Sequence, residues 1–253
     1  MIADVVDVWL IRADLPAPVL ADLEALLDDT ERQRADALLE AADRGRFVAA
    51  HGAARVLIGR RLGAPPVQLR WRYGPHGKPE LAGPWTGVQV SLSHSGEFAA
   101  VALTGARRVG IDVQRLLAGV DVTGMAERFY PPADARFVAT GRGAADQARR
   151  FTRLWTRKEA CVKVGGGRLI PGLRLPVCGP DQIGPDEGVA GQTVAGQGVT
   201  GQVLGPGPAG TPPAPCLVRD VPMPAGFYAA VALEGPLPYR VTRHWWPGDR
   251  PMT

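Results

Sequence analysis

Cysteine is scarce in this chain, and its few positions form no recognisable pattern. Cys161, Cys178 and Cys216 are odd in number, include no CxxC pair and have no histidine cluster beside them. Disulfide frameworks and structural zinc sites both require such spacings. The sequence therefore argues against a disulfide-held scaffold and a zinc site, and we expect reduced thiols.

Long apolar runs are also lacking. Near the sequence motifs the longest uninterrupted run is Phe98–Leu103, far shorter than the roughly 20 residues that a membrane span needs. The first residues carry Asp4 and Asp7, where a secretion signal would have a basic region. We therefore expect a cytoplasmic protein without a membrane partner.

Charge of one sign is not in large excess. The 29 basic and 25 acidic residues leave a net charge of +4, which is too small for a dedicated nucleic-acid binder but compatible with local basic patches for an anionic ligand. Glycine and proline, by contrast, are abundant: Gly 32 and Pro 24 are about double their usual share. Such an excess belongs in loops, and the 253 residues suffice for one large or two small domains.

Secondary-structure patterns divide the first half of the chain. Apolar residues recur at helical spacing over residues 20–62, which predicts two helices there, and turn-forming residues over 73–79 predict a loop. Three β-rich runs follow, Val88–Ser93, Glu97–Thr104 and Val109–Val113. We interpret them as a small antiparallel meander.

One stretch of sequence occurs twice. Phe98–Gly105 and Tyr228–Gly235 share six of eight residues and exchange one aromatic residue for another. The repeat favours duplicated supersecondary units, although two short strands rich in Ala and Val can also match by chance. If the units are duplicated, the chain has two similar α+β halves, and a ligand is expected at their interface.

A helix is predicted over residues 150–163, because the glycines at 165–167 stop it. Glu159 and Lys163 lie along one edge of its apolar stripe, where the ordinary interpretation is an i,i+4 pair worth about 0.2–0.5 kcal/mol. Lys158 does not fit that interpretation, since it falls inside the apolar stripe. A lysine that points inward predicts a buried anion for it to meet.

The strand Val109–Arg115 places Asp112 and Gln114 on one face and Ile111 and Val113 on the other. Mg²⁺ usually takes one or two carboxylates and completes its shell with water and substrate phosphate. Asp112, with a glutamate from a separate helix, is therefore a candidate magnesium site. The alternative is an ordinary exposed face of an edge strand.

Two further segments carry polar groups. Ser93 and His94 end an apolar strand, but neighbouring strand residues point to opposite faces, so a serine-histidine hydrolase pair is disfavoured and donors to a phosphate fit better. The absence of a G-x-S-x-G turn also argues against a hydrolase. Lys78 lies on a rigid loop with Pro79 and could reach an anionic ligand, although a lone loop lysine is more often merely exposed.

Four ordered motifs together resemble the Sfp-type 4′-phosphopantetheinyl transferases. They are Gly77-Lys78-Pro79, Ser93-His94-Ser95, the strand from Val109 to Gln114, and Trp155-Thr156-Arg157-Lys158-Glu159-Ala160-Cys161-Val162-Lys163. The helix Arg46–Arg55 also resembles the basic first helix of that family. The resemblance covers about residues 40–240 at the level of the fold.

The resemblance implies an α+β pseudo-dimer of two similar halves, each a small antiparallel sheet packed with helices. The N-terminal half, on the nucleotide side of coenzyme A, would be 1–108, and the C-terminal half, with the metal and the catalytic helix, 109–245. Residues 178–215 would be a Gly/Pro-rich loop inserted in the second half, and 246–253 a tail. With both halves in one chain, a monomer is expected.

The reaction that the resemblance implies moves the phosphopantetheine arm of coenzyme A to a serine of an apo acyl or peptidyl carrier protein and releases 3′,5′-ADP. Asp112 and Glu159 would hold Mg²⁺ at the pyrophosphate, and Glu159 or a water on the metal would take the serine proton. Asp112, Glu159 and Lys163 would thus be the catalytic residues. The expected coenzyme A contacts are Arg46, Arg55, Lys78, Pro79, Ser93, His94 and Lys158.

One position departs from the family pattern. Gln114 stands where the family has a third acid, so this metal ligand would carry no charge, and either water replaces it or Mg²⁺ binds more weakly. A non-catalytic protein that binds coenzyme A or a nucleotide on the same scaffold is the alternative, but it would not need both Asp112 and Glu159. No residue selects among fatty-acid, polyketide and nonribosomal-peptide carriers.

Overall fold

The computed structural model describes residues 4–105, 107–167, 169–177, 193–194, 199–202 and 215–248. Its α-helices are α1 (Ala17–Glu24), α2 (Asp29–Asp36), α3 (Ala41–Leu62), α4 (Val122–Phe129), α5 (Pro132–Ala139), α6 (Ala144–Gly165) and α7 (Leu169–Gly172). Its strands are β1 (Asp4–Arg12), β2 (Trp71–Tyr73), β3 (Pro79–Leu81), β4 (Gln89–Ser95), β5 (Phe98–Thr104), β6 (Val109–Arg115), β7 (Thr193–Val194), β8 (Val199–Gln202), β9 (Pro215–Val221), β10 (Phe227–Glu234) and β11 (Tyr239–Trp245).

Two sheets form the centre of the molecule. The first has the strand order β4-β5-β1-β11-β7, and the second has the order β6-β10-β9-β8. The pairing of β1 with β11 is parallel, whereas the other pairs in both sheets are antiparallel. A short hairpin, β2-β3, stands apart from both sheets. The predicted mixture of helices with small antiparallel sheets is confirmed.

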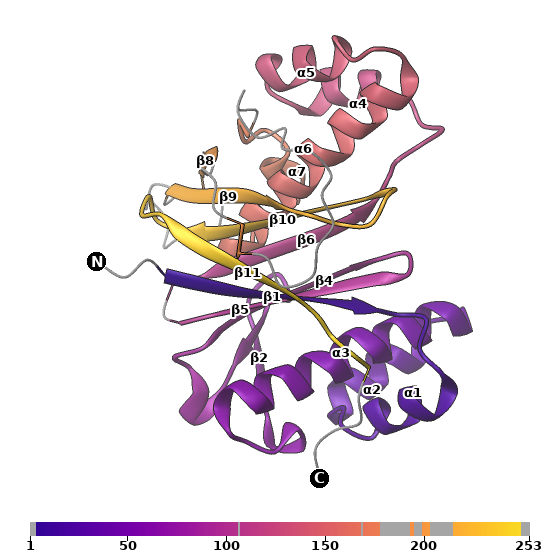
Figure 1. Ribbon diagram of the computed structural model, residues 1–253, viewed down its shortest axis with the longest axis vertical. Coiled ribbons are helices and arrows are strands. Elements are labelled where there is room, and N and C mark those ends of the chain that lie inside the picture. Colours follow the sequence, from indigo (N-terminus) through magenta and orange to yellow (C-terminus); the bar gives the residue numbers. More distant parts are fainter. Residues whose placement is uncertain are drawn as a thin grey trace.

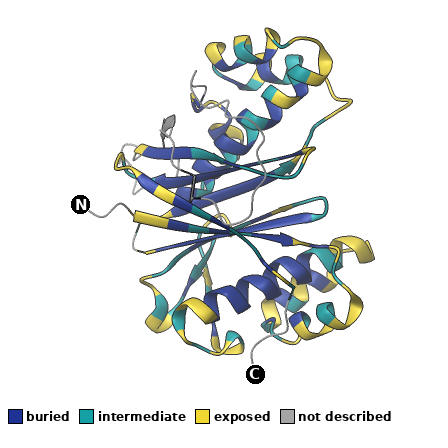
Figure 2. Ribbon diagram, in the orientation of Figure 1, coloured by how far each residue is buried: buried dark blue, intermediate teal, exposed yellow. Residues whose placement is uncertain are grey.

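The elements stack as helices, sheet, sheet and helices. In Figure 1, α1–α3 lie outside the first sheet and α4–α7 outside the second, with the two sheets facing each other between them. Strand β5 shows why: Phe98, Ala100 and Ala102 belong to the core between the sheets, while Ala99 and Val101 pack in the core under the helices. Both faces of the central strands are therefore buried, as Figure 2 shows.

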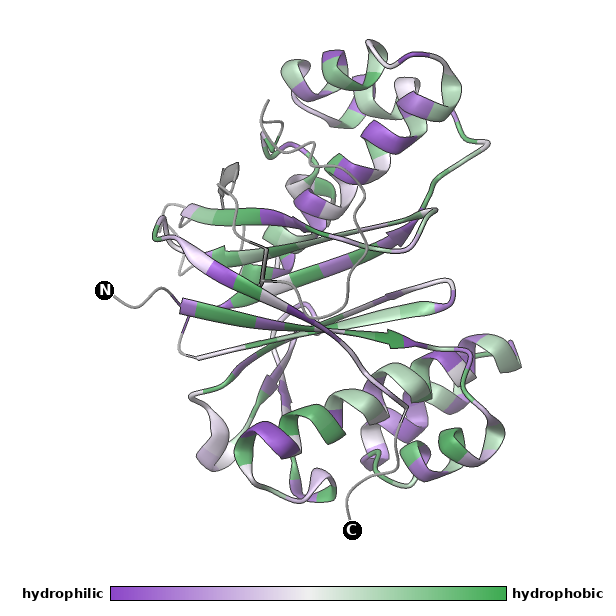
Figure 3. Cartoon of the chain, in the orientation of Figure 1, coloured by the Kyte–Doolittle hydropathy of each residue, from purple (hydrophilic) through white to green (hydrophobic). Residues whose placement is uncertain are grey.

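Apolar and hydrophilic residues occupy different layers of the molecule. The strands of both sheets are mainly apolar, and hydrophilic residues gather on the helices and loops outside them (Figure 3). Within the part of the chain that the structure describes, no helix combines the length and hydropathy of a membrane span. The predicted cytoplasmic location is not tested by this finding and stays a prediction.

The repeated sequence occupies one interior strand in each sheet. Phe98–Gly105 covers β5, which lies between β4 and β1, and Tyr228–Gly235 covers β10, which lies between β9 and β6. The pseudo-dimer and the boundary at residue 108 are not tested by these pairings and stay predictions. Most of the predicted loop 178–215 and of the tail lies outside the described residues.

The prediction of two helices over residues 20–62 is wrong, since three helices span that region. The extra boundary is a capping box: the Asp28 side chain accepts a hydrogen bond from the Glu31 N–H at 2.9 Å, and the Glu31 carboxylate accepts one from the Asp28 N–H at 3.1 Å. This reciprocal pair satisfies free N–H groups of the first turn and starts α2. The spacing of apolar residues alone does not reveal it.

The predicted meander is also wrong at its third strand. β4 and β5 pair as expected, but β6 crosses to the second sheet and pairs with β10, because β1 already occupies the other edge of β5. β6 remains beside β4 through side chains: the hydroxyls of Ser91, Ser93 and Ser95 accept the N–H groups of residues 111, 113 and 115 at 3.0, 3.2 and 3.0 Å. A row of serines thus joins the edges of the two sheets.

Gly110 sets how closely α6 approaches β6. A Cβ added at Gly110 would lie 2.0 Å from the carbonyl oxygen of Ala160 and 2.6 Å from the amide nitrogen of Val164. Both atoms are backbone, so they cannot rotate out of the way. Only glycine permits this approach of helix to strand, and the approach brings the polar face of β6 to α6.

Replacing Gly110 by alanine is expected to destabilise the protein by at least about 1–3 kcal/mol, because the added methyl group overpacks a backbone contact. Thermal unfolding, followed by circular dichroism, measures the loss. Gly105→Ala is the matched control, since nothing lies within 4 Å of the Cβ position at Gly105. Equal shifts of Tm in the two variants would contradict the assignment.

Candidate functional site

Three side chains from three elements meet where α6 covers β6. Lys163 of α6 donates hydrogen bonds to Oδ1 of Asp112 on β6 at 2.7 Å and to the Ser93 hydroxyl of β4 at 2.9 Å. The Ser93 hydroxyl in turn donates to Asp112 Oδ1 at 2.8 Å. The predicted alternation along β6 is confirmed here, since Ile111 and Val113 face the core between the sheets. Asp112 lies instead on the face toward α6.

Asp112 is buried, and only one of its two oxygens is satisfied. Burial raises the pKa of Asp112, and the charge of Lys163 and the hydrogen bonds from Lys163 and Ser93 offset part of this effect. Its second oxygen, Oδ2, is buried with no hydrogen-bond partner among the described residues. An orphaned carboxylate oxygen costs free energy, which a bound cation can recover.

Glu159 lies on the same edge of α6 as Lys163 and is half-buried. Burial and then the negative charge of Asp112 raise the pKa of Glu159 to about 7, while Lys163 opposes this shift. The carboxylates of Asp112 and Glu159 therefore repel each other. Gln114, two residues after Asp112 on β6, is half-buried, and its Nε2 donates to the carbonyl oxygen of Arg115 at 3.2 Å.

We call Asp112, Ser93, Lys163, Glu159 and Gln114 the Asp112 group, and its oxygen donors fit Mg²⁺. Within the described ranges there is no cluster of three or more His, Cys, Asp and Glu that could hold a metal. Two carboxylates and one amide oxygen are, however, what Mg²⁺ takes when water and substrate phosphate complete its shell. The unpartnered Oδ2 of Asp112 and the repulsion between Asp112 and Glu159 are the observations that support the fit.

A cavity of about 530 Å³ lies between α2, α3 and β4. Its lining residues are Arg34, Ala37, Leu38, Asp43, Arg46, Phe47, His51 and His94. Arg34 and Arg46 bring positive charge to the wall, and Arg46 forms an ion pair with Asp43, which also lines the cavity. Burial, and then the neighbouring His51 and Lys163, lower the pKa of His94. Because His94 follows Ser93 on β4 and Ser93 bonds Asp112, the cavity lies near Asp112.

An aromatic stack forms one wall of the cavity. The rings of Phe47 and His51 stack with centroids 3.9 Å apart, and the Arg34 guanidinium lies 5.4 Å from the Phe47 centroid and 5.8 Å from that of Tyr73. Sequence reasoning missed Arg34 and His51. Arg34 stands in a charged run from Glu31 onward, where nothing in the pattern separates a wall residue from a solvated one.

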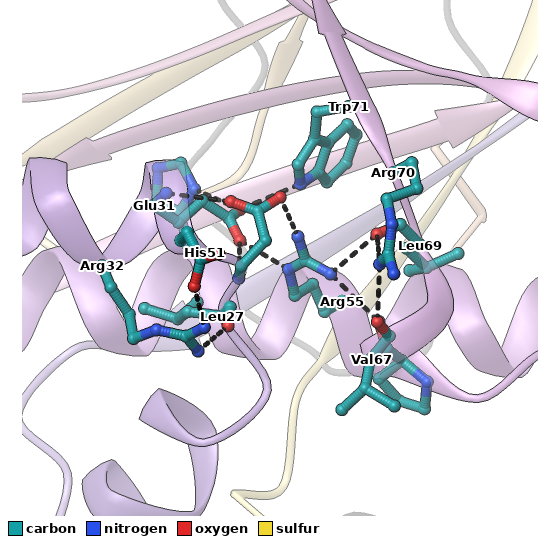
Figure 4. A network of polar contacts seen from close by, with 12 residues as sticks. Leu27, Glu31, Arg32, His51, Arg55, Val67, Leu69, Arg70 and Trp71 are labelled. Carbon is teal, nitrogen blue, oxygen red and sulfur yellow. Dashed lines mark hydrogen bonds and ion pairs between the residues drawn. The ribbon is translucent and has the colours of Figure 1, made fainter.

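The carboxylate of Glu31 supports this wall by contacting His51 (Figure 4). Its buried carboxylate contacts His51 Nδ1 at 3.1 Å and accepts hydrogen bonds from Trp71 Nε1 at 2.9 Å and Arg55 Nε at 2.6 Å. Burial raises the pKa of Glu31, but the His51 hydrogen bond and the charge of Arg55 outweigh it and lower the pKa overall. Because an ionised carboxylate only accepts hydrogen bonds, His51 carries its hydrogen on Nδ1 and donates a hydrogen bond from it to Glu31.

Arg55 is not at the cavity surface. It is 0% exposed, and besides Glu31 it donates to Asp28 at 2.6 Å and to the carbonyl oxygens of Pro66 and Leu69 at 3.1 Å. These contacts tie α2 and α3 to the chain that leads into β2. The structure thus places Arg55 in the support of the cavity, and its predicted contact with coenzyme A stays a prediction.

Lys158 also points away from the Asp112 group. It is 0% exposed, donates to Asp134 and to the carbonyl oxygen of Leu175 at 2.5 Å, and its Nζ lies 4.4 Å from the centroid of the Tyr130 ring. The buried anion that the sequence predicts for this lysine is therefore Asp134 of the same chain. The predicted contact of Lys158 with coenzyme A likewise stays a prediction.

The loop predicted over residues 73–79 is confirmed at 74–78, where it joins the two strands of the β2-β3 hairpin, but Tyr73 and Pro79 belong to those strands. Pro79 begins β3 opposite Tyr73. The Nζ of Lys78 donates to the carbonyl oxygens of Val109 at 3.1 Å and Val164 at 3.0 Å. Burial, more than any charge, lowers the pKa of Lys78 to about 8.

A hydrolase pair of Ser93 and His94 does not form. The Ser93 hydroxyl is buried and bonded to Asp112, Lys163 and the N–H of Val113, whereas His94 lines the cavity. Cys161 and Cys216 are free thiols, both buried, with their Sγ atoms 3.3 Å apart. Cys178 lies outside the described residues.

Comparisons with known proteins agree on one family. The family model described as the 4′-phosphopantetheinyl transferase superfamily matches residues 108–191, which include Asp112, Glu159 and Lys163. The 4′-phosphopantetheinyl transferase HetI of Nostoc sp. is 34% identical over 170 residues, which cover 66% of this chain and 70% of the relative. The 4′-phosphopantetheinyl transferase AcpT of Salmonella typhi is 33% identical over 135 residues, covering 53% of this chain and 68% of the relative. The phosphopantetheinyl transferase of Thraustochytrium sp. is 29% identical over 175 residues, covering 64% and 61%.

Proposed function

The chain belongs to the 4′-phosphopantetheinyl transferase superfamily and is an enzyme of that class, and from this premise we propose that it converts apo carrier proteins to their holo form. It would take phosphopantetheine from coenzyme A and place it on a carrier serine, with Mg²⁺ required and 3′,5′-ADP released. The observation that carries the proposal is the meeting of Asp112, Lys163 and Ser93 beside a cavity lined by Arg34 and Arg46.

The transfer makes one bond and breaks one. The carrier serine oxygen attacks the phosphorus that bears the pantetheine arm, and the bond from that phosphorus to the oxygen of 3′,5′-ADP breaks. Phosphoryl transfer asks the protein mainly for positioning and charge neutralisation. Lys163 supplies positive charge at the pyrophosphate, and Glu159, half-buried at the same edge of α6, accepts the serine proton.

Asp112 and Glu159 would hold the Mg²⁺, with the amide oxygen of Gln114 as a neutral third ligand. When bound, Mg²⁺ neutralises charge on the pyrophosphate and on the leaving group. The Ser93 hydroxyl and the Lys163 ammonium group both donate to Oδ1 of Asp112, at 2.8 and 2.7 Å, and so fix the orientation of this carboxylate. The free oxygen of Asp112 is thereby left for the cation.

The cavity beside this group is the proposed site for the nucleotide end of coenzyme A. Its volume of about 530 Å³ suits a nucleotide, and Arg34, Arg46 and His94 supply donors for phosphate. The Phe47–His51 stack offers a flat apolar wall for the adenine ring. Arg34 and His51 are thus added to the coenzyme A contacts expected from the sequence.

Intact-mass measurement of apo carrier proteins tests the proposal. Fatty-acid, polyketide and nonribosomal-peptide carriers are incubated separately with the protein, coenzyme A and Mg²⁺. One phosphopantetheine added per carrier, and none after chelation of the metal, is the expected result for at least one carrier. Tight binding of coenzyme A without any mass gain, on every carrier and at every Mg²⁺ concentration, would overturn the proposal.

A further inference from the structure

The C-terminal end of α6 is capped by a side chain from a distant segment. The last carbonyl groups of a helix have no partner inside the helix. At this end Gly166 adopts the left-handed conformation, with φ of 64°, and stops the helix. The carbonyl oxygen of Val164 in this last turn accepts a hydrogen bond from Lys78 Nζ at 3.0 Å. Lysine suits this place, because the helix dipole puts negative charge there.

The same ammonium group reaches the first residue of β6. Lys78 Nζ donates to the carbonyl oxygen of Val109 at 3.1 Å. One cation thus joins the start of β6 to the end of α6. The side chain is half-buried, and the lowered pKa, at about 8, reflects this enclosure. Two of its three donor positions are therefore committed to backbone oxygens.

The bridge lies next to the atoms that the reaction needs. Asp112 follows Val109 by three residues on β6, and Lys163 directly precedes Val164 on α6. The 2.7 Å contact between Lys163 and Asp112 exists only while α6 keeps its register against β6. Gly110 allows the close approach of the two elements, but a glycine cannot hold them in register.

We infer that Lys78 is a positioning residue that fixes α6 against β6, and that it serves the transfer step through this helix and not through contact with coenzyme A. The kinetic part of the inference rests on the proposed function. The structural part rests only on the two hydrogen bonds of Lys78 and on the close packing at Gly110. The inference replaces the ligand contact that the sequence predicts for Lys78.

Lys78→Met keeps an unbranched, flexible side chain of nearly the same length and removes its donors. We expect kcat to fall between about 10- and 100-fold, because a small misplacement of reacting groups is costly, while KM for coenzyme A changes less than about twofold. The matched variant Arg46→Met removes a cation from the cavity. Here KM for coenzyme A should rise about 10-fold, with kcat changed much less. The two variants should therefore show opposite patterns.

A second measurement uses the wild-type protein and does not depend on turnover or on the stability of a variant. The chain has three lysines, Lys78, Lys158 and Lys163, of which Lys158 is 0% exposed. Acetylation by acetic anhydride is followed at each lysine by peptide mass spectrometry. S-methyl coenzyme A serves as the ligand, because its blocked thiol does not consume the reagent. We expect it to protect Lys163 and to leave the labelling rate of Lys78 unchanged.

Three results would overturn the inference. One is a rise of KM without a fall of kcat in Lys78→Met, and another is no change in either constant. The third is protection of Lys78 by S-methyl coenzyme A to the same degree as Lys163. If Lys78→Met does not fold, or if no carrier is modified, the labelling alone decides, so failure of the proposed function remains distinguishable from failure of this inference.

Discussion

Replacing Glu159 by glutamine is expected to lower kcat/KM for carrier modification by about 10²–10⁴-fold. Glutamine keeps the size of the side chain, but it cannot accept the serine proton and brings no negative charge to a divalent cation. Initial rates of holo-carrier formation, measured by mass spectrometry over a range of Mg²⁺ concentrations, give the effect. Raising the Mg²⁺ concentration should not restore the rate, because the proton acceptor is missing at any metal occupancy.

Asp146→Asn is the matched control on the same helix. Asp146 lies in the first turn of α6 and forms ion pairs with Arg149 at 3.5 Å and Arg150 at 3.1 Å. Asp146 lies far along α6 from Glu159. The rate of carrier modification by the Asp146→Asn variant should therefore remain within about twofold of the wild-type rate. A loss of similar size in both variants would show that any charge on α6 matters, and it would remove the special role of Glu159.

The stability of Glu159→Gln separates lost chemistry from a lost fold. The pKa of Glu159 is raised from 4.5 to about 7 in the folded chain, so its ionisation is less favourable there than in the unfolded chain. Stability without metal therefore falls as pH rises from about 4.5 to 7, and the penalty is complete above that range. Glutamine removes the penalty. In metal-free buffer at pH 8, Glu159→Gln should have a Tm equal to or above that of the wild type.

Replacing Asp134 by alanine is expected to destabilise the protein by about 3–5 kcal/mol, because Lys158 would keep its charge in the core without a carboxylate. Both residues are 0% exposed, and Asp134 also accepts a hydrogen bond from the N–H of Val177 at 3.4 Å. For a chain of this size, such a loss lowers Tm by roughly 6–20 °C. Differential scanning calorimetry measures it.

The double variant Asp134→Leu with Lys158→Met tests the same pair in a second way. Well-packed apolar residues often replace a buried ion pair at little cost, so the double variant should recover at least half of the lost Tm. Its KM for coenzyme A should remain within about twofold of the wild-type value, since Lys158 lies away from the Asp112 group. A large rise of KM at normal stability would return Lys158 to the coenzyme A contacts.

Local patterns in the sequence suffice for some of the candidate site. Period two along β6 places Asp112 on the opposite face from Ile111 and Val113, and the structure agrees. The stripe of α6 predicts that Lys158 turns inward, and it does. These inferences succeed because each depends only on residues within one element.

Other parts of the site depend on pairings that local patterns do not contain. The partner of Lys158 lies 24 residues earlier, on α5, and nothing near Asp134 marks it as buried. The crossing of β6 to the second sheet depends on β1 having taken the edge of β5. The role of Lys78 likewise depends on where two carbonyl groups of other elements lie. Such long-range contacts are set by the packing of the whole chain.

The position of β1 has a consequence for synthesis of the protein on the ribosome. β1 is made first, but its neighbours in the sheet are residues 98–104 and residues 239–245. The first pairing can form early, whereas the parallel pairing with β11 must wait until residue 245 has been added. Throughout the interval one edge of β1 is an open template for pairing with other chains. Completion of the first sheet is therefore a late event in the life of the nascent chain.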